Sequence, residues 1–335
     1  MDRDEARTVK RQLAGYIGEL LADRVQASGV QPEASGPGLG VGLGLAPLPD
    51  GGYGVAVRYR LGVPTARMVA RKVVEQVGPT ADVRRTGRIR AVPGRTAPAP
   101  RPPVVTALAV GETGRVRPLR PGVSIAHVDV SAGTLGAFVE VDGALHALSN
   151  YHVLVGSPSA RLGDPIVQPG PADRGRDPED RVGVLAGFQQ LAPGRTAVVD
   201  AAVARLDEPR VDLAYPVGPI TTTTEALGGE EVAKIGRTTG VTRGRVTAIE
   251  LDDVVVGYGE ELGELSFDNQ IEVESTSASP FSRGGDSGSL VYRTDGVGLG
   301  LLFAGSETGG DNGNGLTYLN PIGVALEALG ARLAG

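Results

Sequence analysis

From residue 104 to the end of the chain, short apolar segments alternate with turns rich in Gly, Pro, Asp and Asn. Short strands separated by such turns are typical of all-β barrels and sandwiches. Long helices would instead need apolar residues at intervals of three and four. The 51 glycines and 24 prolines also favour many turns. We therefore expect residues 104–335 to form a mainly β domain, with one closing helix over residues 321–334.

The first hundred residues follow a different pattern. Residues 3–28 carry apolar side chains at helical spacing, which predicts an amphipathic helix that faces a core. Residues 53–60 read as a strand, residues 64–77 as a helix with proline in its first turn, and residues 82–92 as a second strand. Together these elements predict a small α/β domain over residues 1–100, whose role the sequence does not reveal.

Two stretches near this domain are rich in special residues. The proline-rich residues 93–103 predict a linker. Glycine occupies alternate positions from residue 36 to residue 44. A dinucleotide-binding loop would need a helix directly afterwards, but Pro47 and Pro49 stand at that point. We therefore interpret the stretch as a glycine-rich strand with close backbone contacts.

Composition excludes several classes of site. The chain has no cysteine, so it has no disulfide, no thiol nucleophile and no cysteine-ligated metal. A net charge of −6 gives no nucleic-acid signature, and no run of about 18 apolar residues predicts a membrane span. The charged N-terminus lacks a signal-peptide core. We expect a cytoplasmic protein with no cofactor, no metal, and neither nucleic acid nor membrane as a partner.

The most informative segment is the Gly-Gly-Asp-Ser-Gly-Ser-Leu-Val string at residues 284–291. Its serine, Ser287, lies between glycines just before an apolar strand, so its hydroxyl is uncrowded and the backbone can approach a ligand closely. The N–H groups of Gly285 and Ser287 can converge on a developing oxyanion. Taken alone, the string also fits an ordinary turn.

A serine hydroxyl needs a base to become a nucleophile, and the chain has three histidines. His152 stands where an apolar strand gives way to a loop, a suitable place for a catalytic imidazole. His146 lies within an alternating segment and is interpreted as a strand-face residue, and His127 has no distinctive context.

The carboxylate that orients the base should be partly buried. Asp200 lies within the apolar segment 197–206, where an unpaired charge would be costly. Asp207 and Asp212 are alternatives, but both stand among turn residues, where acids are usually solvated.

With these motifs the chain resembles the chymotrypsin-like (trypsin-fold) serine protease family. The order His152, Asp200, Ser287, with gaps of 48 and 87 residues, matches the family. The matching segments are residues 148–153, 199–203, 285–289 and the Gly-x-Thr-Thr-Gly hairpin within 234–244. More narrowly, residues 131–139, the Ser-Asn-x-His form and residues 168–170 resemble a cytosolic-type bacterial group similar to the plant narrow-leaf trypsin-like proteases. The resemblance covers roughly residues 120–330.

The resemblance implies a double β-barrel and a serine endopeptidase that acts on proteins or peptides through an acyl-enzyme. The chain departs from the animal members because it lacks disulfides and an evident activation site. In those members a freed N-terminus pairs with the acid beside the nucleophile, here Asp286. We expect Asp286 to pair internally instead, with an arginine as one candidate.

Carried over from the family, the base of the primary specificity pocket is Phe281, and the opposite wall is the strand containing Phe303 and Gly305. An aromatic residue cannot offset the cost of burying a substrate cation, so we expect cleavage after small or medium apolar residues. The alternative is that Phe281 packs in the core.

Two further hypotheses remain open. The chain can instead be a catalytically silent scaffold or a partner-binding regulatory protein with the same fold. The N-terminal domain can also mediate homo-oligomerisation or present the protease to a regulatory partner.

Overall fold

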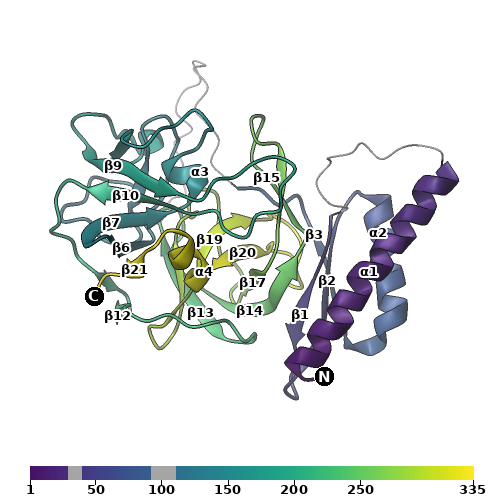
Figure 1. The fold of residues 1–335 in the computed structure, drawn as a ribbon. Helices are drawn as coiled ribbons and strands as arrows, with labels where there is room; N and C mark the ends of the chain where they lie inside the picture. Colours follow the sequence, from purple (N-terminus) through teal and green to yellow (C-terminus); the bar gives the residue numbers. More distant parts are fainter. Residues whose placement is uncertain (29–39, 92–110) are drawn as a thin grey trace.

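The computed structural model describes residues 1–28, 40–91 and 111–335. Two large sheets, of nine and eight strands, make up most of this part of the chain (Figure 1). The predicted linker at residues 93–103 and the start of the glycine-rich stretch lie outside the described residues. No described helix combines the length and the apolar character needed to cross a membrane.

The N-terminal unit is the predicted small α/β arrangement. It comprises α1 (Arg3–Ser28), β1 (Val41–Pro47), β2 (Tyr53–Arg60), α2 (Pro64–Val77), the 3-10 turn η1 (Gly78–Thr80) and β3 (Ala81–Thr86). Strands β1 and β2 are antiparallel, and α2 returns the chain so that β3 runs parallel to β2. Both helices cover the same face of this sheet (Figure 1), where Leu13 and Val69 pack against Val55 and Val57.

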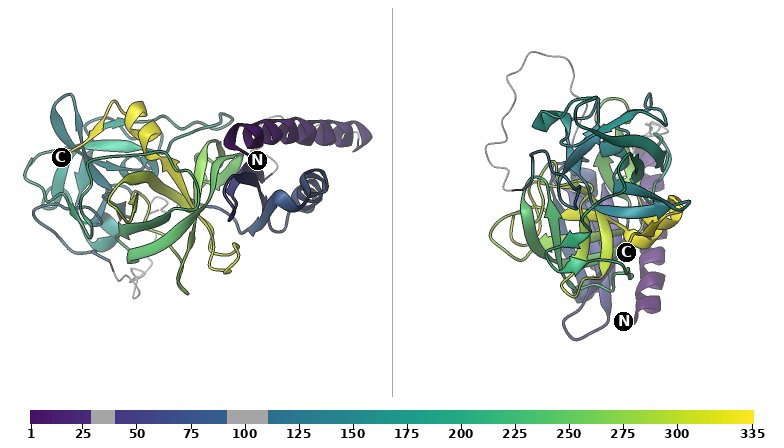
Figure 2. Two further views of the ribbon diagram at one scale, coloured as in Figure 1. Left: turned by 90° about the horizontal axis from the view of Figure 1, so that it is seen from below. Right: turned by 90° about the vertical axis from the view of Figure 1, so that its left-hand side faces the viewer.

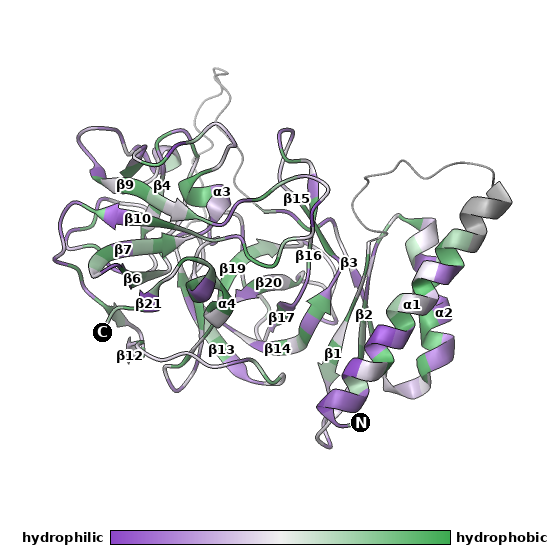
Figure 3. Cartoon of the chain, viewed as in Figure 1, coloured by the Kyte–Doolittle hydropathy of each residue, from purple (hydrophilic) through white to green (hydrophobic). Residues whose placement is uncertain are grey.

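Hydropathy explains why the helices dock. Hydrophilic and hydrophobic residues alternate along α1 and α2, while β1 is largely hydrophobic (Figure 3). In α2 the buried residues Ala66, Val69, Ala70 and Val73 recur at spacings of three and four, as expected for one face of a helix.

The eight-stranded sheet has the order β21-β6-β7-β10-β9-β8-β4-β5. Its strands are β4 (Ser124–His127), β5 (Gly133–Thr134), β6 (Ala137–Val141), β7 (Ala144–Ser149), β8 (Pro165–Val167), β9 (Arg181–Phe188), β10 (Ala202–Leu206) and β21 (Arg332–Leu333). It also carries the short helix α3 (Tyr151–Leu154) and the 3-10 turn η2 (Pro171–Asp173).

The nine-stranded sheet contains a closed barrel. Its order is β13-β18-β19-β20-β17-β14-β1-β2-β3, and a further pairing of β13 with β14 closes six of the strands into a ring. These six are β13 (Glu231–Gly236), β14 (Gly240–Asp252), β17 (Gln270–Ser275), β18 (Leu290–Arg293), β19 (Gly298–Gly305) and β20 (Thr317–Pro321). Two hairpins lie apart: β11 (Ala214–Tyr215) with β12 (Gly218–Pro219), and β15 (Val254–Gly257) with β16 (Glu264–Phe267). The fold is thus the expected chymotrypsin-like double β-barrel with a small α/β unit before it.

The N-terminal unit continues the barrel sheet. Strand β1 pairs with the end of β14, with Leu45 opposite Ile249 and Leu43 opposite Asp252. A Cβ at Gly44 would lie 2.9 Å from the carbonyl oxygen of Ile249, so the alternating glycines permit this close approach. The N-terminal unit accordingly occupies one end of the molecule (Figure 2), where β1 lies next to β14 in the sheet.

Two predicted elements differ from the structure. The closing helix is shorter than residues 321–334, because α4 (Ile322–Ala328) ends before Gly330, whose φ is +59°, and β21 then pairs with β6. The predicted strand 82–92 ends at Thr86 as β3, although Arg90 forms isolated bridges to Gly257 and Gly305.

Candidate active site

His152 and Asp200 lie in direct contact between neighbouring strands. Antiparallel pairing of β7 with β10 sets Ser149 opposite Ala202, so α3, which follows β7, starts beside the residues that precede β10. The distance from His152 Nδ1 to Asp200 Oδ2 is 2.5 Å, and the His152 backbone N–H donates to Asp200 Oδ1 at 3.3 Å. Asp200 is fully buried and His152 is 4% exposed, so this pair is shielded from water.

Tyr258 is a second donor to the Asp200 carboxylate. Its hydroxyl donates to Oδ2 at 2.6 Å. The Tyr258 ring packs edge-on against the His152 ring, with centroids 5.9 Å apart, and stacks on Phe267. Burial and the nearby charge of Asp200 raise the pKa of Tyr258 well above its ordinary value, which keeps the phenol protonated as a donor. Tyr258 follows β15 directly, where the sequence shows no motif to single it out.

The backbone around Asp200 is also held by two amide side chains. Asn150 donates to the Asp200 carbonyl at 2.7 Å, and Asn320 accepts from the Asp200 N–H at 3.0 Å. Both asparagines are fully buried. Because Asn150 also precedes α3, it links the positions of His152 and Asp200.

Ser287 lies on a tight turn next to this pair. Gly285 and Gly288 both have a φ of +94°, which only glycine adopts easily. A Cβ at Gly285 would lie 2.5 Å from Thr238 Oγ1. The Ser287 carbonyl accepts from the Thr134 N–H at 2.8 Å.

One glycine connects the turn to the histidine helix. A Cβ at Gly133 would lie 2.4 Å from a Val153 methyl and 3.1 Å from the Ser287 carbonyl oxygen, so Val153 and Ser287 flank the same residue. Among the described residues, His152 Nε2 has no hydrogen-bond partner, and it is buried. The structure therefore brings His152 and Asp200 into contact and seats Ser287 on the adjacent turn, without a hydrogen bond to Nε2.

Asp286 pairs internally, and its cationic partner is Lys234. The Lys234 Nζ lies 3.3 Å from Asp286 Oδ2, and both side chains are fully buried. Asp286 also accepts from the N–H groups of Thr238, at 2.9 Å, and Thr239, at 3.1 Å. Burial lowers the pKa of Lys234, and the charge of Asp286 opposes that effect. The nearby Arg237 pairs with Asp173 instead of Asp286.

The three predicted pocket residues lie in different surroundings. Phe281 is 2% exposed and belongs to a buried cluster that includes Val246 and Val273 of the closed barrel. Phe303 is fully buried, with its ring centroid 4.8 Å from that of Phe267. Gly305 exchanges two backbone hydrogen bonds with Arg90, which donates to it at 3.0 Å and accepts from it at 3.2 Å.

The alternative acids and bases lie elsewhere. His127 contacts Asp164 at 3.2 Å, and His146 is a buried residue on β7. Asp207 and Asp212 are both exposed. Among residues 1–28, 40–91 and 111–335, no group of three or more His, Asp or Glu side chains is placed to hold a metal ion.

Comparisons with known proteins give matches to solved structures only. No family model matches the sequence, and no curated protein does. Thermobifida fusca protease A is 22% identical over 64% of this chain and 98% of its own, with a TM-score of 0.45. A glutamic acid-specific serine protease is 24% identical over 64% of this chain and 100% of its own, with a TM-score of 0.46. Cellulomonas bogoriensis chymotrypsin is 22% identical over 64% of this chain and 98% of its own, with a TM-score of 0.43. Similarity at this level leaves the function to be argued from this chain's own residues.

Proposed function

We propose that this chain is a serine endopeptidase that hydrolyses peptide bonds through an acyl-enzyme, with Ser287 as nucleophile, His152 as general base and Asp200 as the residue that orients the histidine. The buried contact between His152 Nδ1 and Asp200 Oδ2, beside the glycine-flanked turn of Ser287, carries this proposal. Tyr258, Asn150 and Asn320 support it, because they hold the aspartate from three further directions.

In the proposed reaction, Ser287 Oγ attacks the substrate carbonyl while His152 Nε2 takes the hydroxyl proton. Asp200 accepts from Nδ1–H and stabilises the imidazolium that forms. The N–H groups of Gly285 and Ser287 donate to the oxyanion, and donors of this kind contribute about 3–4 kcal/mol each to transition-state binding. His152 then protonates the leaving amine, and a water molecule hydrolyses the ester by the reverse sequence.

The test is covalent labelling with a fluorophosphonate probe, followed by mass spectrometry. We expect labelling at Ser287 in the wild type, none in Ser287→Ala, and strongly slowed labelling in His152→Ala. The matched control Ser282→Ala, in the same loop, should label normally. On peptides that differ only before the scissile bond, Leu or Ala should be preferred to Arg.

A probe adduct that persists in Ser287→Ala would mean that another residue is the nucleophile. A wild-type protein that neither labels nor cleaves any peptide would favour the silent scaffold instead.

A further inference from the structure

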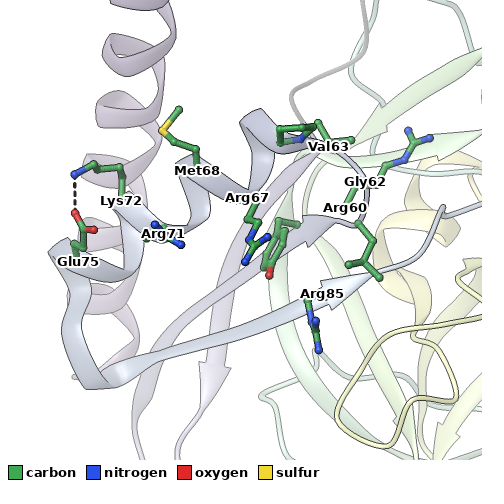
Figure 4. Close-up of a pocket in the computed structure, with 12 residues that line it drawn as sticks. Arg60, Gly62, Val63, Arg67, Met68, Arg71, Lys72, Glu75 and Arg85 are labelled. Carbon is green, nitrogen blue, oxygen red and sulfur yellow. Dashed lines mark hydrogen bonds and ion pairs between the residues drawn. The ribbon is translucent and has the colours of Figure 1, made fainter.

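A groove in the N-terminal unit lies away from the candidate active site and is lined by cations. It has a volume of about 700 Å³. We call it the basic groove; its charged residues are Arg60, Arg67, Arg71, Lys72, Glu75 and Arg85. Figure 4 shows Arg67 and Arg71 on α2 and Arg85 on β3. Nothing in the proposed peptidase reaction uses these residues.

The shape of the basic groove follows from the helix that forms one wall. The lining residues of α2 run from Pro64 to Glu75 at alternating spacings of three and one, so they form a single stripe beside the face that packs on the sheet. Eleven residue steps of a helix span about 16 Å at 1.5 Å per residue. The groove is therefore elongated, and an extended polypeptide of about five residues has a matching length at 3.3 Å per residue.

The charges in the basic groove are only partly compensated. Arg60 pairs with Glu264 at 3.0 Å, and Lys72 pairs with Glu75 at 2.8 Å. In the described part of the chain, Arg67, Arg71 and Arg85 have no ion-pair partner, and all three are exposed. Arginine side chains that line one groove favour carboxylates, which a guanidinium group can bind through paired hydrogen bonds.

Apolar side chains are interleaved with these cations. Tyr59, Leu61 and Met68 also line the basic groove, and Leu61 is 48% exposed. A nucleic acid backbone has no apolar groups to match them, and the chain's net charge of −6 disfavours a polyanion of high charge density. An acidic peptide with intervening apolar residues complements both features.

We propose that the basic groove is a docking site for an acidic, partly apolar polypeptide segment of a partner protein. Arg67, Arg71 and Arg85 bind its carboxylates, and Leu61 and Met68 contact its apolar side chains. This inference does not depend on peptidase activity, because no residue of the candidate active site takes part.

The test is fluorescence anisotropy on the full chain carrying Ser287→Ala, so that the probe is not cleaved. The probe is a labelled synthetic peptide of about ten residues that alternates Glu with Leu, long enough to cover the groove. We expect saturable, salt-sensitive binding that weakens about tenfold or more in Arg67→Gln/Arg71→Gln, because two charge-assisted contacts are lost. The matched control Arg205→Gln/Arg210→Gln, which removes exposed arginines beyond the groove, should bind like the parent.

Four outcomes would overturn the proposal. The first is equal weakening in both double variants. The second is equal binding of a peptide with Gln in place of Glu. The third is tighter binding of a single-stranded oligonucleotide of equal charge. The fourth is concentration-dependent self-association that the groove variant abolishes while the peptide does not bind, which would make a second copy of the chain the occupant.

Discussion

Tyr258 and His152 both contact Oδ2 of Asp200, at 2.6 and 2.5 Å. In the proposed reaction the Tyr258 hydroxyl therefore positions the carboxylate that must stabilise the imidazolium. We expect Tyr258→Phe to lower kcat by about tenfold to a hundredfold with little change in KM, because hydrogen bonds to charged groups contribute about 1.5–3 kcal/mol. Steady-state kinetics on a peptide substrate measures this directly.

Tyr53→Phe is the matched control for Tyr258→Phe. The Tyr53 hydroxyl donates to the Leu227 carbonyl at 2.8 Å, beyond the candidate site. It should leave kcat unchanged. If Tyr258→Phe lost thermal stability but kept its kcat, the tyrosine would serve packing alone.

Lys234 and Asp286 form a fully buried ion pair beneath the nucleophile turn. We expect Lys234→Met to lower the free energy of unfolding by about 3–5 kcal/mol, because the carboxylate of Asp286 would be left buried without its cation. Lys72→Met, which breaks an exposed pair, should lower the free energy of unfolding far less, because water screens that pair. Chemical denaturation of both variants gives the comparison, and similar midpoints would show that the hydrogen bonds to Asp286 suffice.

At the scale of elements, helix α1 docks onto β14 through charge as well as packing. Arg3 and Arg7 donate to the Glu250 carboxylate at 2.9 Å each, and Lys10 pairs with Asp252 at 2.5 Å. Burial raises the pKa of Glu250, but the hydrogen bonds from Arg7 and Arg3 outweigh it and hold the pKa below the ordinary value of 4.5.

This pKa shift predicts a pH-sensitive helix. A carboxyl whose pKa is lower in the folded chain stabilises it above the unfolded pKa, and that stability is lost as pH falls through the folded pKa. We therefore expect the hydrogen-exchange protection factors of α1, which account for the slower intrinsic exchange in acid, to fall selectively below pH 4.5, the ordinary value. Glu250→Gln should show the low protection already at pH 7, and Glu231→Gln, which removes an exposed acid, should not. A uniform loss of protection over the whole chain would contradict the prediction.

Elements with strong local signals could be predicted closely. The helix 64–77 and the strand 53–60 have the bounds expected from periodicity and from Pro64, because local residues decide them. The end of the chain could not be predicted, since Gly330 interrupts an otherwise helical pattern and β6 offers a strand partner far away in sequence. The pairing of β1 with β14 joins residues some 200 positions apart, and no local pattern encodes it.

At the scale of the whole molecule, the N-terminal unit reaches the wall expected for the substrate pocket. Arg90 exchanges backbone hydrogen bonds with Gly305 at the end of β19, and Ile89 and Ala91 bond to Gly257 at the end of β15, so Arg90 bridges these two strand ends. In the proposed peptidase, a peptide substrate that pairs with Gly305 as a strand competes with Arg90 for these backbone groups. We expect Arg90→Pro, which removes the N–H donor to Gly305, to lower KM by about fivefold, because substrate no longer displaces a hydrogen bond worth about 1 kcal/mol.

Arg88→Ala is the control for Arg90→Pro. It removes a neighbouring exposed side chain and leaves the backbone donors intact, so KM should stay as in the wild type. An unchanged KM in a well-folded Arg90→Pro protein would show that substrate does not use the Gly305 edge.

The sequence predicts residues of the candidate site only where they lie within a recognisable motif. Glycine flanks, histidine scarcity and an acid in an apolar segment singled out Ser287, His152 and Asp200. The partners of Tyr258 and Lys234 lie 58 and 52 positions away, so the sequence does not show these contacts, although Lys234 begins the matching segment 234–244. Tyr258 belongs to no motif. Phe281 packs in the barrel core. The family resemblance does not predict this position, because this chain lacks the family's disulfides and the loop can follow another path.

The pairing of β1 with β14 limits where this chain can be truncated without exposing a strand edge. Beyond the stretch that β13 occupies, β14 has β1 as its neighbour at residues 249–252, and the apolar side chains of Leu43 and Leu45 come with it. A chain shortened to begin after residue 91 would leave this edge of β14 unpaired. Its exposed amide and carbonyl groups could then pair with a strand from another molecule. The two predicted domains therefore share one continuous sheet, and aggregation is the expected result of separating them.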